Sequence, residues 1–133
     1  MYAGITAPQL SYRAGNNLEG LKFRVVRLTG TGLYVDLAGA NQFPLGILTT
    51  DPQSGEAAAA DYAGQIKVQV GGAVSPGQLL TTAASGYAVA VASGAAGEER
   101  WVFAQAQFAA ASGDICRAVW YGPSQLNSGV AAV

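Results

Sequence analysis

Apolar and polar residues alternate along several short segments of the chain, and glycine-containing turns separate these segments. The clearest segment is 65–70 (QIKVQV), where one Ile and two Val alternate with Gln, Lys and Gln. Successive side chains of a β-strand point to opposite faces, so this alternation predicts a strand with one buried and one solvent-facing side. The same pattern, or a short run rich in β-branched and aromatic residues, recurs along most of the chain.

The fold class follows from the number and spacing of these segments. Eight short strands separated by turns predict an all-β fold, either a compact β-sandwich or a β-barrel. Two alanine-rich stretches, 56–63 and 101–111, suit either a strand or a short helix, and the aromatic residues of the second favour a strand. The predicted strands cover residues 23–28, 33–37, 44–48, 65–70, 78–82, 87–91, 101–108 and 115–121.

Two turns have sequences that specify their geometry. Pro76-Gly77 supplies a fixed φ followed by a residue that tolerates positive φ, as a type II turn requires. Ser85-Gly86 lies between two predicted strands and indicates a β-hairpin.

The two ends of the chain lack a clear period. Residues 1–22 contain Pro8 and a Gly-Asn-Asn run, with scattered apolar residues between them, and are predicted as an extended N-terminal arm. Residues 23–122 are predicted as the β-rich core domain, and residues 123–133 as a loop-like C-terminal tail.

Composition removes several classes of site. The chain has 133 residues, no histidine and one cysteine, so catalysis by a histidine triad and metal sites built from His or several Cys are excluded. Cys116, within a predicted strand, is expected to be a small buried residue. Ala and Gly make up a third of the chain, charged residues 11% and the net charge is −1. Because a net charge near zero favours association, this composition predicts a subunit that contacts other subunits.

Charge is unevenly distributed along the sequence. The first 27 residues carry a net charge of +3, residues 28–99 carry −5 and residues 100–133 carry +1. Four basic residues do not form the dense cationic stripe that nucleic acids require, and no run of about 18 apolar residues is present. We therefore expect neither nucleic acid nor membrane as a partner, although the basic and acidic segments suit contacts between neighbouring subunits.

No motif supports catalysis or cofactor binding. Gly30-Thr31-Gly32 lacks the remaining residues of a phosphate-binding loop, and clustered Asp and Asn of a calcium loop are absent. The hairpin at Ser85-Gly86 lacks the lysine of biotinyl and lipoyl carrier domains. We expect a non-enzymatic protein without metal or cofactor. One alternative is a carbohydrate-binding module, whose candidate aromatic residues are Tyr87, Trp101, Trp120 and Tyr121, although tryptophans within strands more often belong to the core.

The order of several short motifs is similar to that of the capsid cement, or decoration, proteins of tailed bacteriophages. The likeness spans residues 23–121. The motifs that carry it, in order, are 43–47 (FPLGI), 63–68 (AGQIKV), 74–80 (VSPGQLL), 86–89 (GYAV), 102–106 (VFAQA) and 110–115 (AASGDI).

This resemblance implies a structural protein on the outer surface of a phage head, made in the host cytoplasm and then part of the virion. Its partners would be the major capsid protein, whose neighbouring copies it staples together, and itself, as a homotrimer or alternatively a dimer. Another phage structural subunit, such as a tail or head-fibre base, is the related alternative. Six residues are expected to contact the partner. Tyr12, Arg13, Asn16, Asn17 and Leu18 follow no internal period, and Arg24 is the sixth.

Overall fold

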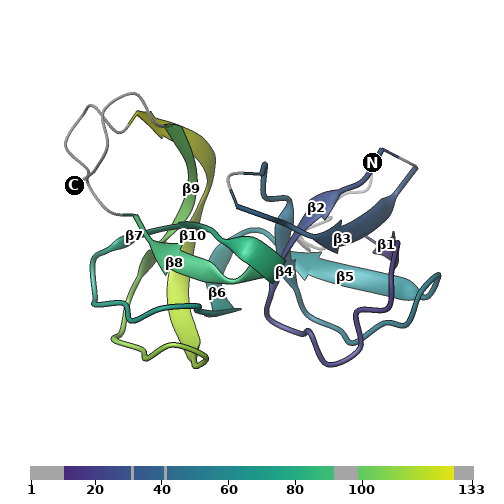
Figure 1. Ribbon diagram of the computed structural model, residues 1–133, viewed down its shortest axis with the longest axis horizontal. Coiled ribbons are helices and arrows are strands. Elements are labelled where there is room, and N and C mark those ends of the chain that lie inside the picture. Colours follow the sequence, from purple (N-terminus) through teal and green to yellow (C-terminus); the bar gives the residue numbers. More distant parts are fainter. Residues whose placement is uncertain (1–10, 31, 41, 92–98, 128–133) are drawn as a thin grey trace, which may run out of the picture.

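The computed structural model describes residues 11–30, 32–40, 42–91 and 99–127, and this part of the chain is almost entirely β-structure (Figure 1). Two units lie side by side along the long axis of the molecule: a small closed barrel and a five-stranded sheet. The barrel contains β1 (Ser11–Ala14), β2 (Val25–Leu28), β3 (Tyr34–Leu37), β4 (Gly46–Leu48) and β5 (Ala57–Asp61). The sheet contains β6 (Gly64–Gln69), β7 (Leu79–Thr82), β8 (Ala88–Ala90), β9 (Glu99–Ala106) and β10 (Ile115–Asn127).

The barrel closes because its first and last strands pair with each other. Its order is β1-β3-β2-β4-β5, and β5 returns to β1 in antiparallel register with Tyr12 opposite Ala58. The one parallel pair is β1 with β3, where Ala14 lies opposite Val35. The interior is filled by apolar side chains of these strands and by Leu18 from the segment between β1 and β2. The buried set is Tyr12, Ala14, Leu18, Val26, Val35, Leu48, Ala58 and Ala60.

The five-stranded sheet also curls toward closure. Its order is β6-β10-β9-β7-β8, and its two edges meet where Val70, just after β6, bridges to Ala88 of β8. The Gly71 N–H donates to the Ala88 carbonyl at 2.8 Å across this seam. Edge strands attract unwanted pairing partners, and this seam covers part of both edges. The β9–β10 pair shifts register between Trp120 and Ser124.

β2 and β4 form a wall that both units share. Val26 and Leu48 face the barrel interior, whereas Val25 and Ile47, their neighbours in sequence, belong to the core of the sheet unit. All four side chains are buried. Because alternate residues of a strand point to opposite faces, a strand covered on both sides needs an apolar run without alternation. The two units therefore share their apolar contacts and form one packed body.

Backbone hydrogen bonds join the two units at their junction, where Phe23 has an unusual backbone conformation. Phe23 has a φ of 71°, a left-handed conformation that is uncommon outside glycine. Its N–H donates to Leu48 O at 2.7 Å in the barrel, and its carbonyl accepts from Gln69 N at 2.8 Å in the sheet. A second bond joins the units where Gly86 N donates to Ala38 O at 2.8 Å.

The predicted all-β fold is confirmed, and a strand overlaps each of the eight predicted segments. Two further strands, β1 and β5, bring the described total to ten. The stretch 56–63 contains β5, and the stretch 101–111 contains most of β9, so both are strand rather than helix. The predicted turns are also observed, with Gly77 at a φ of 88° and Gly86 at 77°.

The predicted ends of the core domain need correction. Residues 11–22 are not an arm, because β1 pairs on both sides and Tyr12, Ala14 and Leu18 are buried in the barrel. The predicted tail from residue 123 likewise begins inside β10, which continues to Asn127. In both places the segment is too short, or too poor in apolar residues, for its alternation to be recognised. Residues 1–10 and 128–133 lie outside the described part of the chain.

Cys116 is buried on β10, as expected from the sequence, and its thiol donates to the Phe108 carbonyl at 3.4 Å. Desolvation by burial raises the pKa of this thiol. Because the thiolate is the reactive form, native Cys116 should react with a chromogenic thiol reagent at least about tenfold more slowly than the urea-unfolded chain. Equal rates in the two states would contradict the buried position.

Candidate interaction surfaces

The structure divides the six predicted contact residues into three groups. Tyr12 and Leu18 are buried in the barrel, so their side chains are not offered to a partner. Arg13, Asn16 and Asn17 are exposed. The Asn16 amide donates to Asp36 Oδ2 at 2.6 Å, and Asn17 Oδ1 accepts from the Glu19 N–H at 3.1 Å. These three residues stay predicted contacts, and so does the sixth residue, Arg24.

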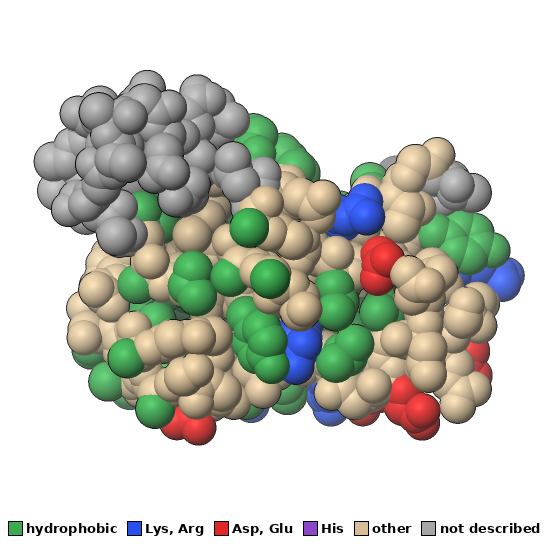
Figure 2. Space-filling model, in the orientation of Figure 1, with side chains coloured by type: hydrophobic (Ala, Val, Ile, Leu, Met, Phe, Trp, Pro, Cys, Tyr) green, Lys and Arg blue, Asp and Glu red, His purple; other side chains and the backbone are tan. Residues whose placement is uncertain are grey.

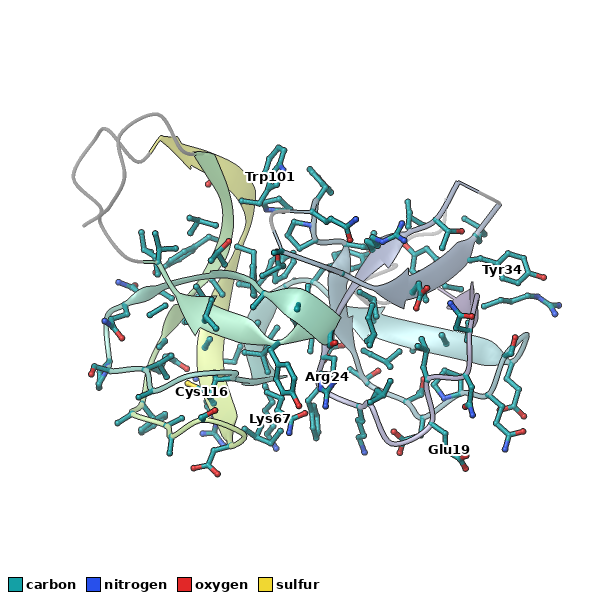
Figure 3. All side chains as sticks on the ribbon, viewed as in Figure 1. Glu19, Arg24, Tyr34, Lys67, Trp101 and Cys116 are labelled. Atoms are coloured by element: carbon teal, nitrogen blue, oxygen red, sulfur yellow. The ribbon has the colours of Figure 1, made fainter. Side chains whose placement is uncertain are left out.

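Arg24 is half-buried between the two units, where it bonds the barrel to the sheet (Figure 3). Its Nε donates to Gln69 Oε1 at 2.8 Å, its Nη1 to Ser85 O at 3.0 Å and its Nη2 to the Tyr87 hydroxyl at 2.8 Å. The guanidinium also lies over the Tyr87 ring, 3.9 Å from its centroid. All three nitrogens are therefore engaged within the chain, so Arg24 joins the barrel to the sheet, and its contact with a partner stays a prediction.

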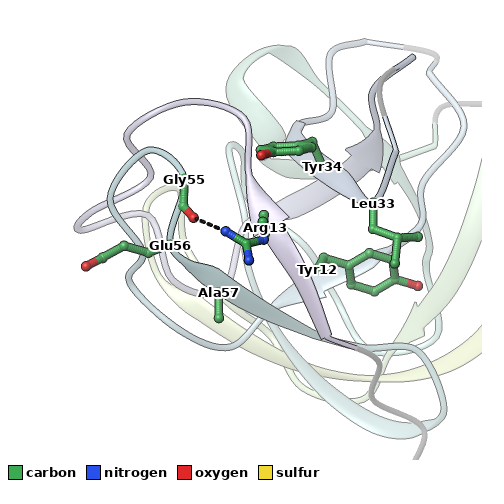
Figure 4. A pocket seen from close by; sticks show the side chains of 7 residues that line it. All are labelled: Tyr12, Arg13, Leu33, Tyr34, Gly55, Glu56 and Ala57. Atoms are coloured by element: carbon green, nitrogen blue, oxygen red, sulfur yellow. Dashed lines mark hydrogen bonds between the residues drawn. The ribbon is translucent and has the colours of Figure 1, made fainter.

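A hollow of about 740 Å³ opens on the barrel beside the parallel β1–β3 pair (Figure 4). Arg13 Nη1 donates to Gly55 O at 3.3 Å there, whereas the Glu56 side chain points away and accepts from Gln53 N at 2.7 Å. Desolvation raises the pKa of Tyr12, so its hydroxyl stays protonated. The hollow offers a guanidinium beside aromatic and apolar groups, but no nucleophile with an adjacent base. Its lining residues are Tyr12, Arg13, Leu33, Tyr34, Gly55, Glu56 and Ala57.

A second surface lies on the outer side of β6, β10 and the end of β9. Alternate residues of β10 face outward there, because Cys116 and Ala118 between them are buried. Three large apolar side chains are exposed on this surface: Tyr121 by 62%, Phe108 by 56% and Ile115 by 44%. Scattered exposed apolar residues are ordinary, but several on one sheet face mark a candidate interaction site. We call this surface the basic sheet face; it comprises Lys67, Phe108, Ile115, Arg117 and Tyr121.

The two cations of the basic sheet face lie directly opposite each other. Lys67 on β6 and Arg117 on β10 are cross-strand partners, and both side chains are exposed. The Arg117 guanidinium lies 5.8 Å from the centroid of the Phe108 ring. Like charges in direct cross-strand register are unfavourable. A negatively charged group bound between Lys67 and Arg117 would therefore relieve their repulsion.

The described carboxylates are concentrated elsewhere. Of the carboxylates whose side chains the structure describes, all except Asp114 belong to residues 11–61, and in Figure 2 the acidic side chains gather mainly over the barrel half. Asp114 lies next to the basic sheet face, where its Oδ2 accepts from Ala111 N at 3.4 Å within a turn. The face itself carries apolar and basic side chains.

Amide side chains next to the basic sheet face hold one another and Tyr121 in place. Gln65 Nε2 donates to Gln107 Oε1 at 3.0 Å, diagonally across β10. The Tyr121 hydroxyl donates to Gln105 Oε1 at 2.8 Å, and Gln105 Nε2 donates to Gly77 O at 2.9 Å. These bonds hold the side chains in place before any partner arrives, which lowers the entropic cost of binding.

The four aromatic residues considered for sugar binding each have a separate environment. Tyr87 lies under Arg24, and Trp101 forms an edge contact with Phe43 at 4.8 Å. Trp120 packs on Phe103 of the core at 5.5 Å, while Tyr121, on the other side of the strand, bonds to Gln105. A stacking platform needs coplanar exposed rings, and these four residues do not supply one.

Within residues 11–30, 32–40, 42–91 and 99–127, no three of the potential ligands His, Cys, Asp and Glu come together to hold a metal ion. The same part of the chain contains no helix with the length and apolar character needed to cross a bilayer.

Comparison with known proteins gives a likeness of fold. Neither the protein-family models nor the curated proteins give a match. Among solved structures, the chain is similar to the N base of the head fibre gp8.5 of bacteriophage phi29, with a TM-score of 0.67 and 20% sequence identity. The match covers 84% of this chain and 92% of the phage chain. At this identity the likeness establishes a shared all-β fold over most of both chains.

Proposed function

We propose that this chain is a non-enzymatic structural protein of a bacteriophage head, attached to the outer surface of the capsid shell. The main support for this proposal is that the fold of the chain matches the base of a phage head fibre over most of both chains. The order of its sequence motifs, which resembles that of capsid cement proteins, supports the same location independently.

Two roles on the shell suit this fold. A cement protein binds across the junction between capsid subunits, and its binding free energy adds to the cost of separating them. A fibre base instead binds the shell and carries a further protein outward. The sequence motifs favour the cement role, in which neighbouring major capsid proteins are stapled together, and the structural likeness favours the base role.

Self-association belongs to the same proposal. A homotrimer, or alternatively a dimer, would allow one assembly to engage several equivalent capsid subunits at once. Linked sites of this kind raise the apparent affinity without any new contact, because the second binding event becomes intramolecular. Light scattering on the purified protein would give the number of copies.

Binding to empty shells tests the proposal. Purified protein is mixed with phage capsids assembled without it, and the bound fraction is measured by cosedimentation. We expect binding that saturates at a fixed ratio to the major capsid protein, as a repeated lattice site requires. No saturable binding would overturn the proposal.

The temperature at which loaded shells rupture separates the two roles. A cement protein raises this temperature, because the shell must lose its bound subunits in order to part. A fibre base saturates its sites with no change in rupture temperature. Shells incubated with heat-denatured protein provide the control for nonspecific adsorption.

A further inference from the structure

The basic sheet face combines two features that occur together nowhere else among the described surfaces. It presents two exposed cations in cross-strand register, Lys67 and Arg117, with exposed apolar side chains beside them. These basic and apolar side chains surround a hollow of about 390 Å³, whose lining residues are Lys67, Phe108, Ile115 and Arg117. A side chain of a partner therefore has a place to enter between the two charges.

We propose that the basic sheet face docks on an acidic protein surface of the capsid shell, with a partner carboxylate seated in this hollow and apolar side chains around it. This inference rests on the proposed function and deepens it by naming the face and the chemistry of the partner.

The register between β6 and β10 explains why a carboxylate would bind in this hollow. Lys67 and Arg117 repel each other across the β6–β10 pair, and no ion pair joins either of them to a described carboxylate. Asp114, the nearest in sequence, is held by the turn through Ala111. A carboxylate between the two cations would replace repulsion with two attractions, and an Arg guanidinium binds it through two parallel hydrogen bonds.

The apolar side chains indicate a protein rather than a polyanion. Phe108 and Ile115 line the hollow itself, and Tyr121 lies further along the same strand face. A phosphate backbone needs a longer cationic track than two residues supply. Protein interfaces, in contrast, combine aromatic side chains and arginine with a few well-placed polar groups, which is the composition of this face.

The contact chemistry predicts which variants matter. Arg117→Glu reverses one of the two charges on an exposed side chain and leaves the buried residues of β10 unchanged. We expect it to weaken binding to empty shells by at least about tenfold, and wild-type binding to fall as salt rises. Lys22→Glu is the matched control, since Lys22 is also an exposed cation but lies before the barrel strand β2, and its binding should stay within about twofold of wild type.

An apolar pair of variants tests the rest of the face. Phe108→Ser removes an exposed ring from the hollow, whereas Leu28→Ser removes an apolar side chain that is 46% exposed on β2 of the barrel, outside both hollows. We expect only Phe108→Ser to reduce shell binding. Far-ultraviolet circular dichroism and the urea midpoint of each variant establish that it is folded, since none of the four changes touches the core.

The outcomes separate this inference from the proposed function. If wild-type protein fails to bind shells, the proposed function fails. If wild-type protein binds and Arg117→Glu binds equally well, the proposed function stands and the docking face is wrong. If Arg117→Glu lowers the number of copies in light scattering while its shell affinity is kept, the face joins copies of this chain, and that result overturns the inference as well.

Discussion

Replacing Gly86 with alanine is expected to destabilise the protein by about 2–5 kcal/mol. Gly86 ends the β7–β8 turn with a φ of +77°, where an L side chain costs about 1–2 kcal/mol. A Cβ at this position would also lie 2.8 Å from the carbonyl oxygen of Val25, closer than real contacts allow. Because that oxygen belongs to the barrel backbone, the two units would have to move apart, and overpacking of this kind costs about 1–3 kcal/mol.

Gly77→Ala is the matched control for the backbone conformation. Gly77 has a φ of +88°, but nothing lies within 4 Å of the position of its Cβ. Its replacement should cost only the conformational term, about 1–2 kcal/mol. Urea unfolding measures both variants, with an unchanged denaturant slope as the condition for comparing midpoints. Equal losses in the two variants would mean that the approach to Val25 is not what requires glycine at residue 86.

Local patterns were sufficient for most of the strands. The alternation in β6, and the β-branched and aromatic residues of β2 and β9, reflect the side-chain period of a strand, which does not depend on distant residues. Pro76-Gly77 similarly specifies its own turn. The eight-strand prediction therefore depended on information held within a few residues, and it was confirmed.

Two strands, β1, which was predicted as part of an arm, and β5, which was left open between strand and helix, depend on distant partners. β1 has only four residues, and it becomes a strand because β3 and β5 lie on its two sides. β5 is almost all alanine, which is a better helix former than strand former. Its small side chains instead fit the narrow barrel interior, where Ala58 and Ala60 are buried. Tertiary packing overrides local propensity in such segments.

Surface function was harder to predict than fold. The alternation of β6 correctly placed Lys67 toward solvent. That Arg117 lies opposite Lys67 depends on the register between β6 and β10, which are separated by 45 residues of chain between Gln69 and Ile115. No short-range signal carries this register. The basic sheet face was therefore absent from the sequence prediction, which favoured the N-terminal residues.

The internal role of Arg24 also could not be predicted from the sequence. In sequence it is one of several basic residues near the N-terminus, and that position alone suggests a partner contact. Its three hydrogen-bond partners, Gln69, Ser85 and Tyr87, are 45 to 63 residues away along the chain. A role set by such distant groups is visible only once the chain is folded.

Arg24→Ala is expected to destabilise the protein by about 2–4 kcal/mol. It removes three hydrogen bonds from a charged donor, each worth about 1.5–3 kcal/mol when fully formed and less here because the group is half-buried. The stacking on Tyr87 is lost with them. Because β2 and β4 belong to both cores, unfolding should stay a single transition at lower urea concentration.

Two further variants distinguish an internal tie from a loss of charge. Arg24→Lys keeps the charge but cannot reach three acceptors with one ammonium group, so it should recover only part of the stability. Arg117→Ala removes an exposed arginine and should change the free energy of unfolding by less than about 0.5 kcal/mol. If Arg24→Ala kept wild-type stability and lost shell binding, Arg24 would be a partner contact after all. Lost stability, with the shell affinity of the remaining folded protein unchanged, is the result that the three internal bonds require.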